Sequence, residues 1–188
     1  MADWVAIENA LALWVRTASG YSTGQVIWAE QSPTGTRPVG PMIALRLGDI
    51  TDVTGLDELQ SNTDLLRPAG QEIELRAKGF KKFTLSLQAF GGGTTGATTG
   101  RAVLGALQTS LSLPSYRDAL GAVNVAPLDY GTVQNVTAVD HTKFESRAVC
   151  DFQFYMLDEY SDLTGYIATV DAVPYLGAPL GTRDGIDI

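Results

Sequence analysis

The stretch that decides the fold is QEIELRAKGFKKFTLSLQAF, Gln71–Phe90. Apolar side chains occupy every second position from Ile73 to Ala77 and again from Phe83 to Ala89, with polar or charged side chains between them. This two-residue period is typical of strands that have one buried and one solvated face, which favours antiparallel pairing. We expect a β-hairpin here that turns at Gly79.

Helical patterns precede and follow this stretch. Apolar residues at helical spacing predict a first helix near the N-terminus, with Asp3 as its cap and Gly20 as its left-handed stop. RAVLGALQTSL, residues 101–111, predicts a second helix, and Pro114 is expected to start a third. Further strands are expected at residues 24–31, 42–50, 125–136, 144–157 and 165–173, and an exposed loop at 51–70.

The order of these elements predicts the α+β fold class. Helices are expected to pack on one face of a mostly antiparallel β-sheet. At 188 residues the chain is long enough for one compact core. We expect a single domain over residues 1–173 and an extended C-terminal arm over residues 174–188, because this tail is rich in Gly and Pro and has no period.

Charge and composition exclude several classes of function. The 21 acidic and 13 basic side chains give a formal charge of -8, which disfavours gripping nucleic acid but suits a channel through which DNA slides. The single cysteine excludes an internal disulfide framework, and Cys and His are too few for a metal cluster. The sequence lacks an 18-residue apolar run, and Asp3 and Glu8 stand where a signal peptide carries Lys or Arg, so neither a membrane span nor export by that route is expected.

The stretch DHTKFESRAVCDFQFYMLDE, residues 140–159, holds the only histidine and the only cysteine. In a strand, the nine residues between His141 and Cys150 place their side chains about 30 Å apart, too far for a nucleophile and its base. Cys150 shares the apolar face of this predicted strand and is expected in the core. The opposite face is charged, with Lys143, Glu145, Arg147, Asp151 and Gln153. No catalytic residues are therefore predicted.

Gly91–Gly96 matches the GxGxxG pattern of dinucleotide-binding folds. Such folds begin with a nearly continuous apolar parallel strand, whereas FKKFTLSLQAF alternates with lysines and serine, and two helices follow. We therefore expect a flexible loop and no cofactor. A small nucleotide-binding enzyme that uses this loop stays the least favoured alternative.

Three blocks of the sequence resemble the neck or tail terminator proteins of tailed bacteriophages. They are ALALWVRTASGYSTGQVIWAEQ with RPVGPMIALRL, then FTLSLQAFG leading to ALQTSLSLPSYRDAL, and finally FESRAVCDFQFYMLDEYSDLTGYIATVDA. They run in order from about residue 9 to residue 172. The final block, a charged strand followed by an acidic turn and a Gly-Tyr-Ile strand, is the most telling.

The resemblance implies a structural virion protein without catalytic residues. Its subunits would form a homo-hexameric ring on the end of the tail tube, stop tube polymerisation and bind the head-tail connector, with the tail sheath as a further candidate partner. DNA would pass through the centre without specific binding. Such a protein would belong to the neck of the virion and assemble in the cytoplasm of the host bacterium.

Candidate contact residues follow from this interpretation. Carboxylates are expected to face the lumen, and apolar loops and strand edges to be buried between subunits. The predicted subunit or lumen contacts are Glu145, Arg147 and Asp151, with Arg37 and Arg46 as ion-pair partners between subunits. A connector or tail tube subunit is the alternative, because these virion components share α+β ring designs.

Overall fold

A computed structural model describes residues 2–29, 40–53, 58–63, 66–68, 71, 73–91, 99–136, 138–140 and 143–164. Its helices are α1 (Trp4–Ser19), α2 (Gly100–Ser110) and α3 (Pro114–Gly121), with a short 3-10 helix, η1, at Thr23–Gln25. Its strands are β1 (Val26–Trp28), β2 (Met42–Asp52), β3 (Glu58–Thr63), β4 (Ile73–Phe90), β5 (Val125–Tyr130), β6 (Gln134–Asn135), β7 (Ala138–Asp140), β8 (Lys143–Glu145) and β9 (Arg147–Thr164).

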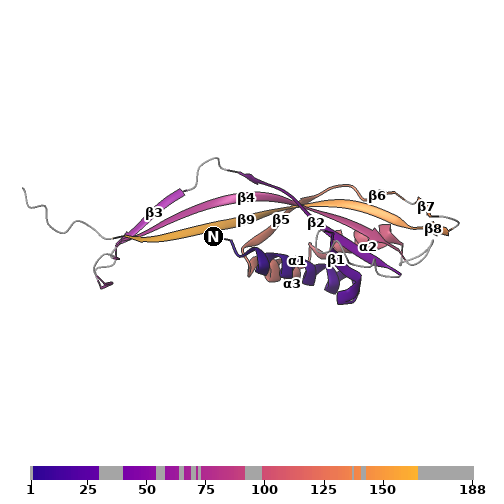
Figure 1. Cartoon of the computed structure of the whole chain (residues 1–188), viewed down its shortest axis with the longest axis horizontal. Helices are drawn as coiled ribbons and strands as arrows, with labels where there is room; N and C mark the ends of the chain where they lie inside the picture. The colour runs from indigo at the N-terminus through magenta and orange to yellow at the C-terminus, as the bar shows by residue number, and fades with distance from the viewer. Residues whose placement is uncertain are drawn as a thin grey trace, which may run out of the picture.

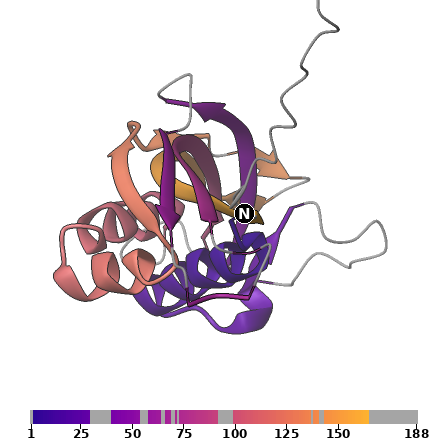
Figure 2. The same cartoon turned by 90° about the vertical axis from the view of Figure 1, so that its left-hand side faces the viewer.

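The strands form a seven-stranded sheet and a separate β7-β8 pair. The main path of the large sheet is β1-β2-β4-β9-β5, while β3 pairs with β4 and β6 pairs with β9. Only the β1-β2 pairing is parallel among the described strands. All three helices lie on one side of the curved sheet (Figures 1 and 2). The predicted α+β fold is confirmed.

The predicted hairpin at Gly79 is wrong, because β4 runs as one strand of 18 residues. The apolar positions before and after Gly79 are in phase, so one long strand satisfies the same two-residue period as two short ones. β9 is equally long and pairs with β4 along its whole length, from Ile73 opposite Thr164 to Phe90 opposite Arg147. The partner of β4 is therefore distant in the sequence.

The other strand bounds also differ from prediction. The expected loop at 51–70 contains β3 and the end of β2. The expected strand 144–157 breaks at Ser146, whose carbonyl accepts a hydrogen bond from Gly91 N–H at 2.7 Å. In the expected strand 24–31, the described residues form the end of η1 and then β1, while residues 30–31 lie outside the described part of the chain. The expected strand 125–136 divides into β5 and β6. The expected strand 165–173 and arm 174–188 lie outside the described residues.

The first helix forms as its sequence predicts. Asp3 caps it by accepting a hydrogen bond from Ala6 N–H at 3.0 Å, and Gly20 ends it with φ 73°. Its apolar stripe is buried against the sheet through Ile7, Leu11, Trp14 and Val15. The second and third predicted helices are also present, and α3 starts at Pro114.

Aromatic rings fill the core between the helices and the sheet. Trp14 lies edge-on to Phe152 and Phe154, with ring centroids 5.4 and 5.9 Å away. Phe83 stacks on Phe154 at 5.4 Å, across the β4-β9 pair. The indole Nε1 of Trp14 also donates a hydrogen bond to Ser110 Oγ at 2.9 Å, which fastens α1 to α2 inside the core.

One end of the sheet extends beyond the helices (Figure 1). This extension consists of β3 with residues 73–80 of β4 and 157–164 of β9. It is called the arm below and is distinct from the C-terminal arm expected over residues 174–188. The order of its strands is β3-β4-β9. The remainder of the sheet, with its helices, is called the body.

Candidate interaction surface

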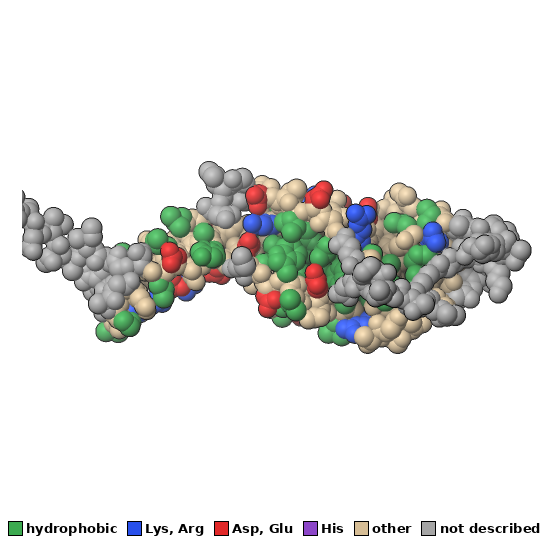
Figure 3. Space-filling model, in the orientation of Figure 1, with side chains coloured by type: hydrophobic (Ala, Val, Ile, Leu, Met, Phe, Trp, Pro, Cys, Tyr) green, Lys and Arg blue, Asp and Glu red, His purple; other side chains and the backbone are tan. Residues whose placement is uncertain are grey.

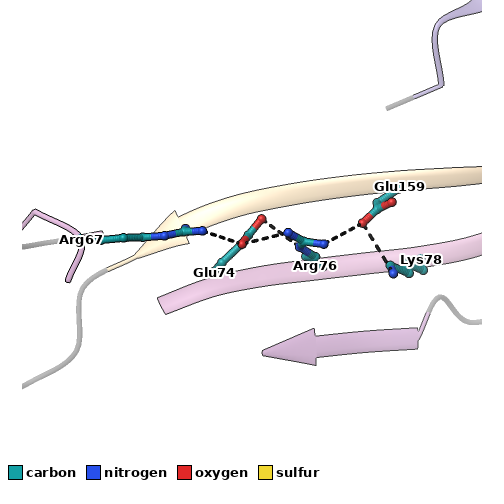
Figure 4. Close-up of polar contacts among 5 residues, drawn as sticks. All are labelled: Arg67, Glu74, Arg76, Lys78 and Glu159. Atoms are coloured by element: carbon teal, nitrogen blue, oxygen red, sulfur yellow. Dashed lines mark hydrogen bonds and ion pairs between the residues drawn. The ribbon is translucent and has the colours of Figure 1, made fainter. Parts of the chain in front are cut away.

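An ion-pair cluster lies on the face of the arm that points away from the helical side of the sheet. Arg76 donates to both carboxylate oxygens of Glu74, from Nε at 2.8 Å and from Nη2 at 3.1 Å. Arg67 Nη2 donates to the same carboxylate at 2.9 Å (Figure 4). Glu159 on β9 extends the cluster, 3.7 Å from both Arg76 and Lys78. The cluster therefore ties β9 and the segment around Arg67 to β4.

Glu74 is 8% exposed, which is unusual for a carboxylate. The hydrogen bond from Arg76 lowers its pKa most, and the bond from Arg67 adds to this against the opposing effect of burial. The same hydrogen bond with Glu74 raises the pKa of Arg76. This carboxylate is therefore held in its charged form.

A second cluster lies where the arm joins the body. Lys81 Nζ is 3.2 Å from Asp158 Oδ2 and 3.7 Å from Asp52 Oδ1. The backbone N–H of Ala2 donates to Asp158 Oδ1 at 2.7 Å. Burial alone raises the pKa of Asp158, but the bonds from Ala2 and Lys81 outweigh it, so the pKa lies below its usual value. These contacts join β2, β4, β9 and the segment that precedes α1.

Two of the predicted contact residues lie in one row across the helix-free face of the body. Ser86 on β4 is opposite Arg46 on β2 and opposite Asp151 on β9. Its Oγ donates a hydrogen bond to Asp151 Oδ1 at 2.5 Å. Both Arg46 and Asp151 are exposed. The row thus presents one positive and one negative side chain on this surface.

The other predicted contact residues are separated from this row. Arg147 is opposite Phe90 at the far end of the β4-β9 pair, and its guanidinium carbon lies 4.7 Å above the Phe90 ring. Glu145 belongs to β8, where its backbone pairs with Ala138. Arg37 and His141 lie outside the described residues. Subunit or lumen contact stays a prediction for all five residues.

Cys150 lies in the core, as predicted, and is 2% exposed. Burial raises the pKa of its thiol, which disfavours the reactive thiolate. Its Sγ accepts a hydrogen bond from Gln108 Nε2 at 3.4 Å and lies 3.3 Å from the carbonyl oxygen of Gly131. These contacts place the thiol between α2 and the segment that follows β5.

The strand context around the glycine loop differs from that of a dinucleotide-binding fold. β4, which precedes the loop, is antiparallel to both β2 and β9. α2 follows the loop with Thr99 as its N-cap, and α3 follows α2. Residues 92–98 lie outside the described part of the chain.

The cluster around Glu74 was not predicted from the sequence. Opposite charges two positions apart on one strand, Glu74 and Arg76, point to the same face, and this spacing was a usable signal. The pairing of Lys78 with Glu159 required knowledge that β9 lies beside β4. Arg67 was assigned to an exposed loop, so its contact with Glu74 was not predicted.

In the described part of the chain, no group of three or more His, Cys, Asp or Glu is placed to hold a metal ion. No helix there is long and apolar enough to cross a membrane. A protein family described as "Phage neck terminator protein" matches residues 5–178. A comparison with curated proteins found no match to the chain.

Proposed function

The chain belongs to the phage neck terminator family, and we propose that it forms a ring that ends the tail tube and binds the head-tail connector. The family match over residues 5–178 carries this proposal, because it includes every described helix and strand except Trp4, the first residue of α1. The family is structural, so the protein is a component of the virion neck.

The shape of the subunit supports ring formation. A ring closes when one surface of each subunit binds a different surface of the next, and the contact repeats around the axis. The arm extends from one end of the body, so it can reach a neighbour while the body keeps its own core (Figure 1). We propose that the ring contains six subunits. Its proposed partners are a tail tube protein and a head-tail connector, with the tail sheath as a further partner.

DNA passes through the centre of the proposed ring. On the helix-free face, the paired strand positions of the described residues carry five basic and five acidic side chains, so this face has no acidic excess. They are Arg46, Arg76, Lys78, Lys82 and Arg147, against Glu58, Glu74, Asp129, Asp151 and Glu159. An acidic lumen lining would therefore come from another surface of the subunit.

Assembly of tails in infected cells tests the function. A phage that lacks this gene is expected to make tubes of irregular length that do not join heads, and the gene supplied in trans restores joined particles. Tubes of normal length, joined to heads, would contradict the proposal. Long filaments formed by the purified chain alone would instead favour a tail tube subunit.

A further inference from the structure

The arm has two strand edges, one on each side of its central strand β4. Among the described strands, β3 pairs only with β4, so its outer side is one edge. On the other side of β4, the pairing of β9 with β5 stops at Met156, so the end of β9 is the second edge. These two sides are called the β3 edge and the β9 edge below. An open edge presents backbone groups that bond to a further strand.

The direction of the backbone groups on the β9 edge follows from the body. Asp151 C=O accepts a hydrogen bond from the segment after β5, and Leu157 N–H donates to the carbonyl of Asn124 at 3.0 Å. Odd-numbered residues of β9 therefore direct their backbone groups away from β4, because these groups alternate along a strand. The same alternation directs the N–H and C=O of Ser161 and Leu163 outward at the β9 edge.

The β3 edge follows from the same alternation on β4. The carbonyl of Phe80 accepts a hydrogen bond from Val53 N–H at 3.0 Å, so even-numbered residues of β4 bond toward the side of β2 and β3. Leu59 and Ser61 lie opposite odd-numbered residues of β4. Their backbone groups are therefore directed outward.

Other edges of the large sheet carry features that prevent strand pairing. β5 contains Pro127, after which its register with β9 shifts. The register of β2 with β4 shifts between Leu47 and Ile50, beyond the residues that β1 covers. β3 and residues 157–164 of β9 contain neither proline nor lysine, and both keep a regular register with β4. Regular edges of this kind recruit another strand, whereas proline and bulges prevent it.

The carboxylates near the two edges do not oppose a contact between them. Asp158 and Glu159 have cationic partners on β4, at 3.2 and 3.7 Å. Of the other two carboxylates, Glu58 lies opposite Lys78 on the helix-free face, whereas Asp162 is on the helical side of the sheet. Glu58 and Asp162 therefore stay on opposite faces when the two edges are joined in one sheet.

Exposed apolar side chains lie beside both edges. Leu59 on β3 is 68% exposed and Tyr160 on β9 is 61% exposed, and both lie on the helical side of the sheet. Hydrophobic side chains are visible on the arm in the space-filling view (Figure 3). Joining the two edges would place these side chains on one face of a continuous sheet, where such pairs stabilise neighbouring strands.

We propose that the β9 edge of one subunit pairs with the β3 edge of the next copy of this chain. β3 and β9 are both antiparallel to β4, so they run in the same direction. Rotation about an axis along the strands keeps this direction, and the contact is then a parallel pair that repeats around a ring. A second copy covers both edges of every arm, whereas a single strand of another protein would leave one edge open. The inference rests on the proposed ring and names the backbone contact that would close it.

Hydrogen exchange of the full chain, as monomer and as assembled ring, tests the contact. Peptides that contain β3 and residues 157–164 are compared by mass spectrometry. The outward amides of Leu59, Ser61, Ser161 and Leu163 should exchange at least about tenfold more slowly in the ring. The β5 peptide is the internal control and should exchange equally in both forms.

A proline variant tests the same contact through the backbone. Ser161→Pro removes an N–H that points away from β4, and it should weaken ring association at least about tenfold. Ser161→Ala keeps this N–H and should leave association unchanged. Unchanged exchange of α1 and of the body strands in the monomer shows that the proline variant still folds.

The possible outcomes separate this contact from the proposed function. A particle that keeps its ring mass while both edge peptides exchange as in the monomer would overturn the contact alone. Equal association of Ser161→Pro and Ser161→Ala would do the same. Edge peptides that are already protected in the monomer would assign the edges to another segment of the same chain and overturn the proposal. A chain that stays monomeric would contradict the proposed function, and the contact with it.

Discussion

Arg76 binds the carboxylate of Glu74 through two nitrogen atoms, at 2.8 and 3.1 Å, although the residues are only two positions apart in β4. Arg76→Met would leave a nearly buried carboxylate with Arg67 as its remaining partner in the cluster. We expect the arm to open locally, because removing one member of such a pair costs more than removing both. Hydrogen exchange of β3 and the first half of β4 should accelerate while α1 keeps its protection.

Two comparisons check that this effect belongs to the pair. The double variant Glu74→Leu with Arg76→Met should regain much of the lost protection, since no unpaired charge remains. Lys78→Met should change exchange less, because Lys78 is 3.7 Å from a half-exposed Glu159. Equal acceleration of hydrogen exchange in all three variants would show that the opening of the arm does not depend on the pair of Glu74 and Arg76.

Acid should destabilise the fold through Asp158. Its pKa is lowered in the folded state, so its stabilising contribution is complete above about pH 5 and is lost as the pH falls through the folded pKa. Urea unfolding between pH 7 and pH 3 measures this loss. Asp158→Asn and Lys81→Met should both reduce the steepness of the decline in unfolding free energy, since each removes the ion pair at the base of the arm. An unchanged acid dependence in both variants would contradict this account.

The two glycines of α2 should respond in opposite directions to alanine. A Cβ at Gly100 would lie 2.6 Å from the Ala89 carbonyl oxygen and 3.0 Å from Ala148 N, so α2 would have to move away from the sheet. Gly100→Ala is expected to cost about 1–3 kcal/mol of unfolding free energy. Gly105 has nothing within 4 Å of such a Cβ, and Gly105→Ala should stabilise the helix by up to about 1 kcal/mol. A neutral Gly100→Ala would show that this close approach does not constrain α2.

The contribution of the hydrogen bond between Trp14 and Ser110 to the unfolding free energy can be measured by removing the hydroxyl of Ser110. Both side chains are buried, so Ser110→Ala leaves the indole N–H without this partner. The expected loss of unfolding free energy is about 1–3 kcal/mol by chemical denaturation. Thr109→Ala removes an exposed hydroxyl from the neighbouring position and serves as the control, with little expected change. Equal effects of the two substitutions would indicate that helix propensity, and not the buried bond, decides the result.

The sequence was sufficient to predict the three helices because the first two have an apolar stripe and all three have a recognisable start. Asp3, Thr99 and Pro114 mark these starts, although only Asp3 and Pro114 were identified in advance. The body strands were also predictable, since their inward positions are apolar and their outward positions polar. Cys150 was placed in the core for the same reason.

The arm was predictable only in part: the alternation from Ile73 to Ala77 indicated a strand, but β3 lacks a buried face. Every residue of β3 is exposed, so the sequence ELQSNT shows no alternation that would distinguish it from a loop. Glycine at position 79 in a charged segment resembles a turn, but here it lies mid-strand opposite Asp158. The contacts of Arg76 and Lys78 with Glu159 depend on this long pairing, so only the spacing of Glu74 and Arg76 could be read from the local pattern.

The most direct test of the central claim is the mass of the purified chain in solution, by light scattering or native mass spectrometry. The account predicts a ring of about 120 kDa, six times the 20.0 kDa subunit. A particle that stays at 20.0 kDa, both alone and with tail tubes, would contradict it.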